Sequence, residues 1–249
     1  MLTAPREQRA GSLWTVFSHP MLLSCAVGYV PSRFDTFSEA KPRGLPPLNG
    51  GELQLCLGSL LECDTGGWVW PGALGLCSWL REDPELVKGA SVLDLGCGTG
   101  AVGLYAAALG ASKVTLTDGG PDAVLRLAQA NVEMNRELVG HAAIEVAPLR
   151  WGDSAAAHGS HDLVLGSDLI YGNADDPEVL AALCWTFAEQ LRNNADCRVV
   201  MANDVRRLMN HEERLGGFQV EAEAAGLEVV TLPSSKSITL LELVIESRV

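Results

Sequence analysis

The feature that most constrains the fold of this chain is a regular alternation of strand and helix patterns that begins near Ser91. Apolar or β-branched runs at residues 92–95 and 113–117 alternate with helical patterns at 101–109 and 121–138. This order is typical of a parallel sheet with helices on both of its faces. At 249 residues, the chain is long enough to bury one core of that size.

The alternation continues towards the end of the chain and then changes. Further strands are expected at 143–146, 162–166 and 198–202, and further helices at 177–191 and 212–225. The last two β-rich runs, 227–232 and 238–245, are joined only by a short turn-type segment, so they form a hairpin and one of them runs antiparallel to its neighbours. We therefore predict an α/β fold with a doubly wound, mostly parallel seven-stranded sheet that ends in an antiparallel hairpin.

The first 50 residues lack this regular pattern, because several prolines and glycines interrupt them. We predict an irregular N-terminal arm over residues 1–50 and one domain over residues 51–249. An apolar stretch at residues 20–30 is too short to span a bilayer, and we expect a buried strand or a docking segment there. After the arm, residues 53–57 suit a strand, and Pro71 suits the first turn of a helix.

The charge of the chain bears on its partners. The formal net charge is −13 at pH 7 and the isoelectric point is about 4.7. The negative electrostatic field of such a chain repels phosphate backbones, so nucleic acid is not expected as a partner. Two interpretations of the acidic surface stay open: it keeps the protein soluble, or it attracts a lysine-rich protein substrate. We expect no membrane association and a monomer.

The seven cysteines are odd in number and include no C-x-x-C pair, which is typical of a reducing compartment. We therefore expect a cytoplasmic location, with the nucleus as a second possibility. His158 and His161 lie in a segment rich in glycine, serine and alanine, with no cysteine nearby. We interpret them as two histidines of a loop, and we expect no metal site.

A glycine-rich segment, DLGCGTG at residues 94–100, follows the first strand of the alternating region. Gly96, Gly98 and Gly100 allow backbone turns that other residues avoid, and they let a ligand approach the main chain closely. Asp118 ends the next strand, where a carboxylate can accept hydrogen bonds from both hydroxyls of a ribose. These features predict a nucleoside cofactor at the carboxyl edge of the sheet.

The glycine segment alone fits an adenosylmethionine or a nicotinamide cofactor, and a tight turn that binds nothing is a third interpretation. Two details favour adenosylmethionine. The glycines are spaced G-x-G-x-G, and Asp94 lies two residues before the first of them, where its carboxylate can order the loop and face the ammonium of the methionine part. The predicted C-terminal hairpin is the second detail, because an ordinary dinucleotide-binding sheet lacks it.

Five segments together resemble the seven-β-strand protein methyltransferases, and within them the non-histone protein-lysine methyltransferase branch. They are VWPGALGLCSWL (69–80), VLDLGCGTGAVGL (92–104), VTLTDGGPDAVLRLAQANVEMN (114–135), RWGD (150–153) and DLVLGSDLIY (162–171). The resemblance runs from about residue 53 to residue 245. It implies a Rossmann-like class I methyltransferase domain over 51–249, S-adenosylmethionine as cofactor and S-adenosylhomocysteine as its product.

The resemblance also implies which residues contact the cofactor. In this family pattern the loop residues Gly96, Cys97 and Gly98 lie under the methionine part, and Asp118 holds the ribose. The remaining positions implied to line the cofactor site are Trp70, Trp151 and Ser167. Cys97 and Ser167 stand where the family often has alanine, and both are small enough to fit. For the two tryptophans, packing in the core is an alternative role.

The segment Asp168-Leu-Ile-Tyr171 follows the fourth strand and resembles the D-x-x-Y motif that this family associates with the substrate lysine. Asp168 could bind and orient the incoming ammonium, and Tyr171 could offer its ring face and hydroxyl. A carboxylate with an ordinary pKa is too weak a base to deprotonate lysine, so we do not assign that role to Asp168. The alternative is that Asp168 caps the following turn and Tyr171 packs in the core.

The hypothesis that these observations favour is an N-methyltransferase that modifies a lysine of an intracellular protein. A histidine or arginine acceptor in a protein, or a small-molecule acceptor, is the first alternative. A non-catalytic binding module on the same fold is an alternative of another class. The sequence does not identify the substrate, the number of methyl groups added or the role of the arm.

Overall fold

The computed structural model describes residues 37–40, 45–48, 51–170, 176–204, 211–235 and 237–245. The apolar stretch at 20–30, Cys25 and Tyr171 lie outside these residues, so the predictions made for them stay predictions. None of the helices in the described ranges combines the length and the apolar character that a membrane crossing requires.

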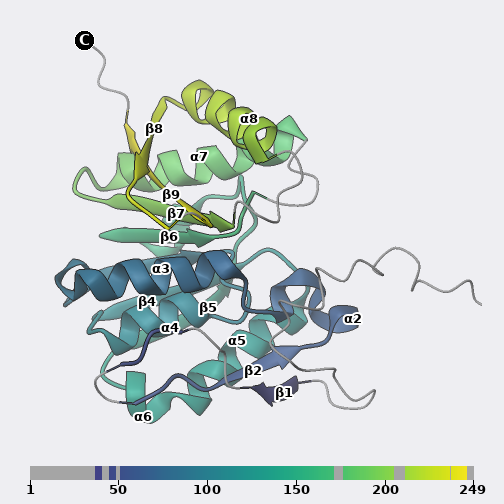
Figure 1. Cartoon of the computed structure of the whole chain (residues 1–249), viewed down its shortest axis with the longest axis vertical. Helices are drawn as coiled ribbons and strands as arrows, with labels where there is room; N and C mark the ends of the chain where they lie inside the picture. The colour runs from purple at the N-terminus through teal and green to yellow at the C-terminus, as the bar shows by residue number, and fades with distance from the viewer. Residues whose placement is uncertain are drawn as a thin grey trace, which may run out of the picture.

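A seven-stranded sheet forms the centre of the molecule (Figure 1). Its first five strands along the chain run parallel, and the last strand pairs antiparallel with both of its neighbours. The predicted doubly wound sheet with a C-terminal hairpin is therefore confirmed. Across the sheet the strands are β5 (Ala143–Pro148), β4 (Lys113–Asp118), β3 (Ser91–Leu95), β6 (Leu163–Ser167), β7 (Arg198–Asp204), β9 (Ile238–Ile245) and β8 (Leu227–Leu232).

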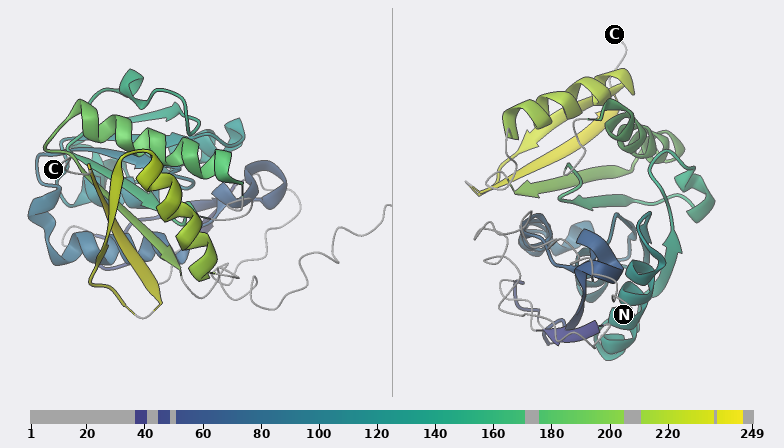
Figure 2. Two further views of the ribbon diagram at one scale, coloured as in Figure 1. Left: turned by 90° about the horizontal axis from the view of Figure 1, so that it is seen from above. Right: turned by 90° about the vertical axis from the view of Figure 1, so that its right-hand side faces the viewer.

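Helices cover both faces of this sheet. The first face packs against α3 and α4, and the second packs against α7 and α8. In the right-hand view of Figure 2, α8 and the C-terminal hairpin lie at the opposite end of the molecule from β1. The helices are α2 (Leu60–Cys63), α3 (Pro71–Glu82), α4 (Ala101–Ala108), α5 (Asp122–Met134), α6 (Arg136–Val139), α7 (Pro177–Asn193) and α8 (His211–Ala224), with 3₁₀ turns η2 (Asp64–Gly67), η3 (Pro84–Leu86) and η4 (Ala155–His158).

The central strand β3 shows why the chain needs both helix layers. Successive side chains of a strand point to opposite faces, so Val92 enters one core cluster and Leu93 and Leu95 enter the other. Val92 joins the cluster that contains Tyr105 of α4, and the two leucines join the cluster that contains Phe187 of α7. A strand buried on both faces reads as a mainly apolar run, and β3 follows this pattern except at Asp94.

Outside the main sheet, β1 (Phe37–Ala40) pairs antiparallel with β2 (Leu55–Gly58). The strand at β2 was predicted, whereas β1 lies in the segment that was expected to be irregular. The pair spans the predicted boundary at residue 50, and β2 contacts α5. The division into arm and domain stays a prediction, but these two strands tie its two sides together.

The single helix predicted over residues 121–138 is two helices, α5 and α6, separated by Asn135. The backbone of Asn135 leaves helical geometry, with φ −99° and ψ 12°. Its side-chain amide donates to the carbonyls of Gln54, at 2.6 Å, and Asn131, at 2.7 Å. Asparagine often ends helices in this way, because its side chain competes for backbone groups.

Candidate active site

A cavity of about 970 Å³ lies at the carboxyl ends of β3, β4, β6 and β7. One wall is the glycine-rich loop after β3, and the facing wall is the segment from Cys63 to Ala73 that contains η2 and the start of α3. The start of α7 completes it. In an open α/β sheet, ligands bind in the crevice beyond the carboxyl ends of the strands, so this is the expected place for a site.

The glycine-rich loop requires glycine for two separate reasons. The φ angles of Gly96, Gly98 and Gly100 are 65°, 53° and 77°, in the left-handed region that other residues rarely adopt. At Gly98 a Cβ atom would also lie 2.9 Å from the carbonyl oxygen of Gly66 in the facing wall. The loop backbone therefore approaches the facing wall closely at Gly98. Gly96, Cys97 and Gly98 also line the cavity.

Asp118 joins the glycine-rich loop to the end of β4. Its Oδ2 accepts a hydrogen bond from the backbone N–H of Gly98 at 3.0 Å, and its Oδ1 accepts one from Gly120 at 2.8 Å. Burial raises the pKa of the Asp118 carboxyl, and these two hydrogen bonds partly oppose that effect. Each oxygen retains a lone pair and the side chain lines the cavity, so it can accept hydrogen bonds from a ligand.

Asp94 lies beneath the loop and is 1% exposed. Its Oδ2 accepts a hydrogen bond from the backbone N–H of Gly103 in α4 at 2.8 Å. Its Oδ1 is buried without a hydrogen-bond partner among the described residues. Burial raises the pKa of this carboxyl to about 7. Asp94 thus orders the start of α4, but it is not among the described residues of the cavity lining, and its contact with the methionine part stays a prediction.

The buried carboxyl of Asp94 makes a testable contribution to stability. A carboxyl whose pKa is raised on folding stabilises the native state at low pH and loses that contribution as pH rises through the folded-state pKa, here about 7. We expect the unfolding free energy of Asp94→Asn to be highest, relative to that of wild type, at pH 8. The difference in unfolding free energy should then fall by up to about 1.4 kcal/mol per pH unit between pH 7 and 5. Urea denaturation of both cofactor-free proteins measures it, and a pH-independent difference would contradict the expectation.

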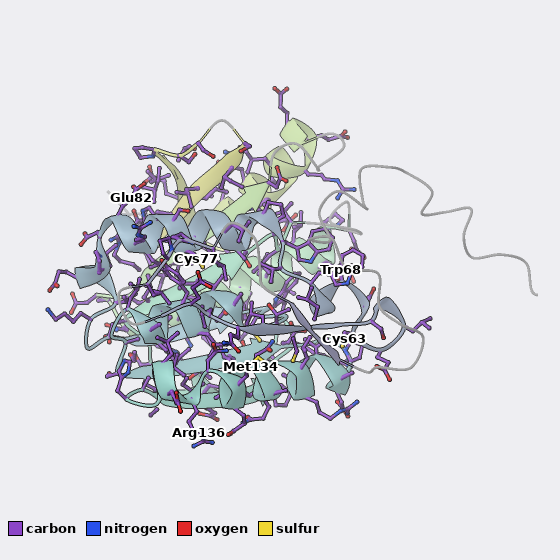
Figure 3. The ribbon with its side chains drawn as sticks, turned by 60° about the horizontal axis from the view of Figure 1, so that its bottom comes forward. Cys63, Trp68, Cys77, Glu82, Met134 and Arg136 are labelled. Atoms are coloured by element: carbon purple, nitrogen blue, oxygen red, sulfur yellow. The ribbon has the colours of Figure 1, made fainter. Side chains whose placement is uncertain are left out.

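Two tryptophans from the segment before α3 line the cavity together. Trp70 was predicted to flank the cofactor, and its ring N–H donates to the carbonyl of Thr65 at 2.9 Å. Trp68 was not predicted, although it lies in the same aromatic segment; its ring centroid is 5.9 Å from that of Trp70. Figure 3 labels Trp68 and Cys63, which both belong to this wall. Their half-buried rings offer a flat apolar surface to a ligand.

Trp151 and Ser167 approach the cavity from the other side of the loop. Ser167 ends β6, and both residues line the cavity, as the resemblance implied. Trp151 also packs against the core cluster that contains Leu169, so the alternative role in packing holds for part of its ring. Gly100, the remaining predicted loop residue, precedes α4 and is not among the described lining residues.

Asp168 is held in place by three hydrogen bonds from two elements, α3 and β7. Its φ of 52° is rare for a residue other than glycine. Its backbone N–H donates to the carbonyl of Ala202 at 2.8 Å, its Oδ2 accepts from Gly72 in α3 at 2.5 Å, and its Oδ1 accepts from Asp204 in β7 at 2.8 Å. Burial raises the pKa of this carboxyl to about 6. The carboxylate of Asp168 thus caps α3 and lines the cavity. The alternative that it caps the following turn involves residues outside the described ranges and stays open.

Asp204 was not among the site residues predicted from the sequence. It ends β7, lines the cavity and is 2% exposed. Its place could have been inferred, because a polar residue that directly follows a buried parallel strand lies at the ligand-binding edge. Asp168 and Asp204 thus bring two carboxyl groups to adjacent strand ends.

Acidic side chains outnumber basic ones in the described lining of the cavity. Six of them, against two arginines, come from five different segments of the chain. Since opposite charges attract, a cationic ligand is favoured over an anionic one. The acidic residues are Asp64, Asp118, Asp168, Asp176, Glu178 and Asp204, and the arginines are Arg150 and Arg214.

Comparison with known proteins decides between the nucleoside cofactors. Residues 52–214 match the profile of a family described as lysine methyltransferase. The chain belongs to this lysine methyltransferase family. It is 34% identical, over 158 residues, to the protein N-lysine methyltransferase METTL21A of Danio rerio, in a match that covers 63% of this chain and 71% of that protein. It is 39% identical, over 116 residues, to EEF1A lysine methyltransferase 3 of Mus musculus, covering 46% and 48% of the two chains.

Solved structures show the same fold at lower identity. The ribosomal protein L11 methylase from Lactobacillus delbrueckii subsp. bulgaricus superimposes with a TM-score of 0.50 at 19% identity, over 71% of this chain and 79% of that one. The methyltransferase domain of bacterial CtHen1-C superimposes with a TM-score of 0.51 at 17% identity, over 69% and 97%. The enzyme is therefore an S-adenosylmethionine-dependent methyltransferase of the lysine methyltransferase family.

The cavity fits this cofactor. Gly96, Cys97 and Gly98 line the cavity with small side chains or none, which the methionine part requires. Asp118 faces the cavity with lone pairs suited to ribose hydroxyls, and Trp151 supplies an aromatic surface suited to adenine. The assignment of individual residues to parts of the cofactor stays a prediction.

Proposed function

We propose that this enzyme methylates the side-chain amine of a lysine in a protein, with Asp168 and Asp204 holding the amine. The proposal rests above all on the two carboxyl groups, which line the same cavity as the glycine-rich loop. The related proteins from Danio rerio and Mus musculus are named as lysine methyltransferases, which supports the same acceptor. The acidic lining adds support, because a lysine arrives as a cation.

When bound, S-adenosylmethionine would supply a methyl group on a positively charged sulfur, and this group would pass in line to the amine nitrogen while the sulfur leaves as the neutral thioether of S-adenosylhomocysteine. The protein must therefore aim the amine and let it lose a proton, since lysine has a reference pKa of about 10.4. Asp168 and Asp204 bind the ammonium and fix its direction. Exclusion of water by Trp68 and Trp70 lowers the pKa of the lysine, and the released proton passes to water.

The rigidity of Asp168 suits this positioning role. Two backbone N–H groups hold its oxygens at 2.5 and 2.8 Å, so the carboxylate loses little conformational entropy when it binds an ammonium. Tyr171 completes the predicted motif, and its role as a ring face and hydroxyl beside the amine remains part of the proposal.

The acceptor can be identified directly. Purified enzyme is incubated with cell lysate and isotopically labelled S-adenosylmethionine, and labelled peptides are read by mass spectrometry. We expect label on lysine side chains. A lysate whose lysine amines have been acetylated is the control and should take up no label. Label confined to histidine or arginine, or equal uptake by the acetylated lysate, would refute the lysine proposal.

We further propose that the enzyme acts as a monomer on a protein in the cytoplasm or nucleus. The six cysteines in the described residues are all buried, and the odd total of seven with no C-x-x-C pair suits a reducing compartment. The net charge of −13 disfavours nucleic acid as a partner. Size-exclusion chromatography with light scattering, and fractionation of cells that express the tagged protein, test the two parts of this proposal.

A further inference from the structure

Asn131 of α5 and Asn135, which directly follows this helix, bind the backbone of the segment around β2. Asn131 accepts from the N–H of Cys56 at 2.6 Å and donates to its carbonyl at 3.2 Å. Asn135 accepts from the N–H of Gln54 at 2.9 Å and donates to its carbonyl at 2.6 Å. The two amides are four residues apart on one face of the helix, so they match alternate residues of an extended chain.

Asn131 makes one contact that Asn135 lacks. Its Nδ2 also donates to the carbonyl oxygen of Thr99, at 2.9 Å, and Thr99 belongs to the glycine-rich loop and lines the cavity. Asn131 is fully buried and lies outside the described lining. Its amide therefore joins three segments that are distant in sequence: β2, α5 and the loop that faces the cofactor.

The segment held by Asn131 leads directly into the wall that faces the loop. After β2 the chain forms α2 and η2, whose residues Cys63 and Gly66 line the cavity. Figure 3 labels Cys63 and Met134, which pack in one apolar cluster with Cys56 between β2 and α5. At the far side of this wall, the carbonyl oxygen of Gly66 would lie 2.9 Å from a Cβ at Gly98. The wall and the loop thus touch backbone to backbone.

We propose that Asn131 is a positioning residue for cofactor binding. By holding Cys56 and Thr99 through one amide, it sets the separation between the glycine-rich loop and the wall from Cys63 to Trp70. Its loss allows these two sides of the cavity to move apart, even though Asn131 touches neither cofactor nor substrate. This role concerns the cofactor alone, so it does not depend on lysine being the acceptor.

The neighbouring asparagine supplies a matched control. Asn131→Ala and Asn135→Ala each remove an amide that binds the β2 segment, but only the first removes the contact with Thr99. Affinity for S-adenosylhomocysteine is measured by calorimetry, and the melting temperature of each cofactor-free protein is measured separately. We expect both variants to melt earlier, Asn131→Ala to bind about tenfold more weakly, and Asn135→Ala to bind within about twofold of wild type.

A third variant keeps the test decisive if Asn131→Ala does not fold. Asn131→Asp preserves the acceptor for the Cys56 N–H and removes the donor to Thr99. It should also bind S-adenosylhomocysteine about tenfold more weakly. The proposal is overturned if either Asn131 variant binds within about twofold of wild type. It is also overturned if Asn135→Ala weakens binding as much as they do, because the effect would then follow from general loss of stability.

Discussion

Asp168→Ala is expected to reduce kcat/KM for the protein substrate by about 1000-fold. The substitution removes the carboxylate that is proposed to pair with the ammonium of the substrate lysine and to orient its amine. Affinity for S-adenosylhomocysteine should fall no more than about threefold, since no predicted cofactor contact involves this carboxylate. Steady-state kinetics with the substrate found by mass spectrometry, together with calorimetry, measure both quantities.

Asp168 also caps α3 through Gly72, so its loss must be separated from a loss of structure. Asp204→Asn neutralises the second carboxyl but leaves its backbone N–H in place, and it should cost about tenfold in kcat/KM. Glu228→Gln removes a charge from an exposed side chain of β8 that lies outside the described cavity lining, so it should have little effect. Wild-type turnover by Asp168→Ala would exclude Asp168 from the mechanism. If Asp168→Ala lost cofactor affinity and turnover to the same extent, Asp168 would have only a structural role.

Asp118→Ala is expected to weaken binding of S-adenosylhomocysteine about 100-fold. Hydrogen bonds to a charged group contribute about 1.5–3 kcal/mol each, and this carboxylate is predicted to accept from the ribose while it also holds Gly98. The rise in melting temperature that a bound ligand produces should shrink accordingly. Calorimetry and thermal denaturation with and without S-adenosylhomocysteine measure the two effects.

The charge at this position can be tested apart from the hydrogen bonds. Asp118→Asn retains one acceptor oxygen and loses the charge, so its affinity should lie between those of wild type and Asp118→Ala, about tenfold below wild type. An affinity of Asp118→Ala within about threefold of wild type would show that the ribose is held elsewhere. The predicted cofactor orientation would then be wrong.

Local sequence patterns predicted most of the fold, because strands buried on both faces and helices with one apolar face leave clear signals. The C-terminal hairpin was predicted within its true bounds, 227–232 and 238–245. The strand β1 was not, since FSEA has weak strand character and forms its hydrogen bonds with residues about 20 positions away.

The site was predicted less completely, for a reason that also involves distance along the chain. The loop glycines and Asp118 follow local spacing rules, and the structure places Gly96, Gly98 and Asp118 in one cavity. Asn131 acts through backbone atoms of Cys56, 75 residues earlier. A side chain that binds a distant backbone leaves no periodic signal in the sequence, so only the folded arrangement reveals it.

The hydrogen bond between Gly72 and Asp168 constrains how this enzyme can diverge. A Cβ at position 72 would lie 2.5 Å from the Asp168 Oδ2 and 2.6 Å from the carbonyl oxygen of Ala202. A residue other than glycine is tolerated there only if both the carboxylate and the β7 backbone move, so a change at position 72 must disturb the position of Asp168. Sorting related genomes by the residue at position 72 would separate enzymes that retain this acceptor geometry from those that have acquired another specificity.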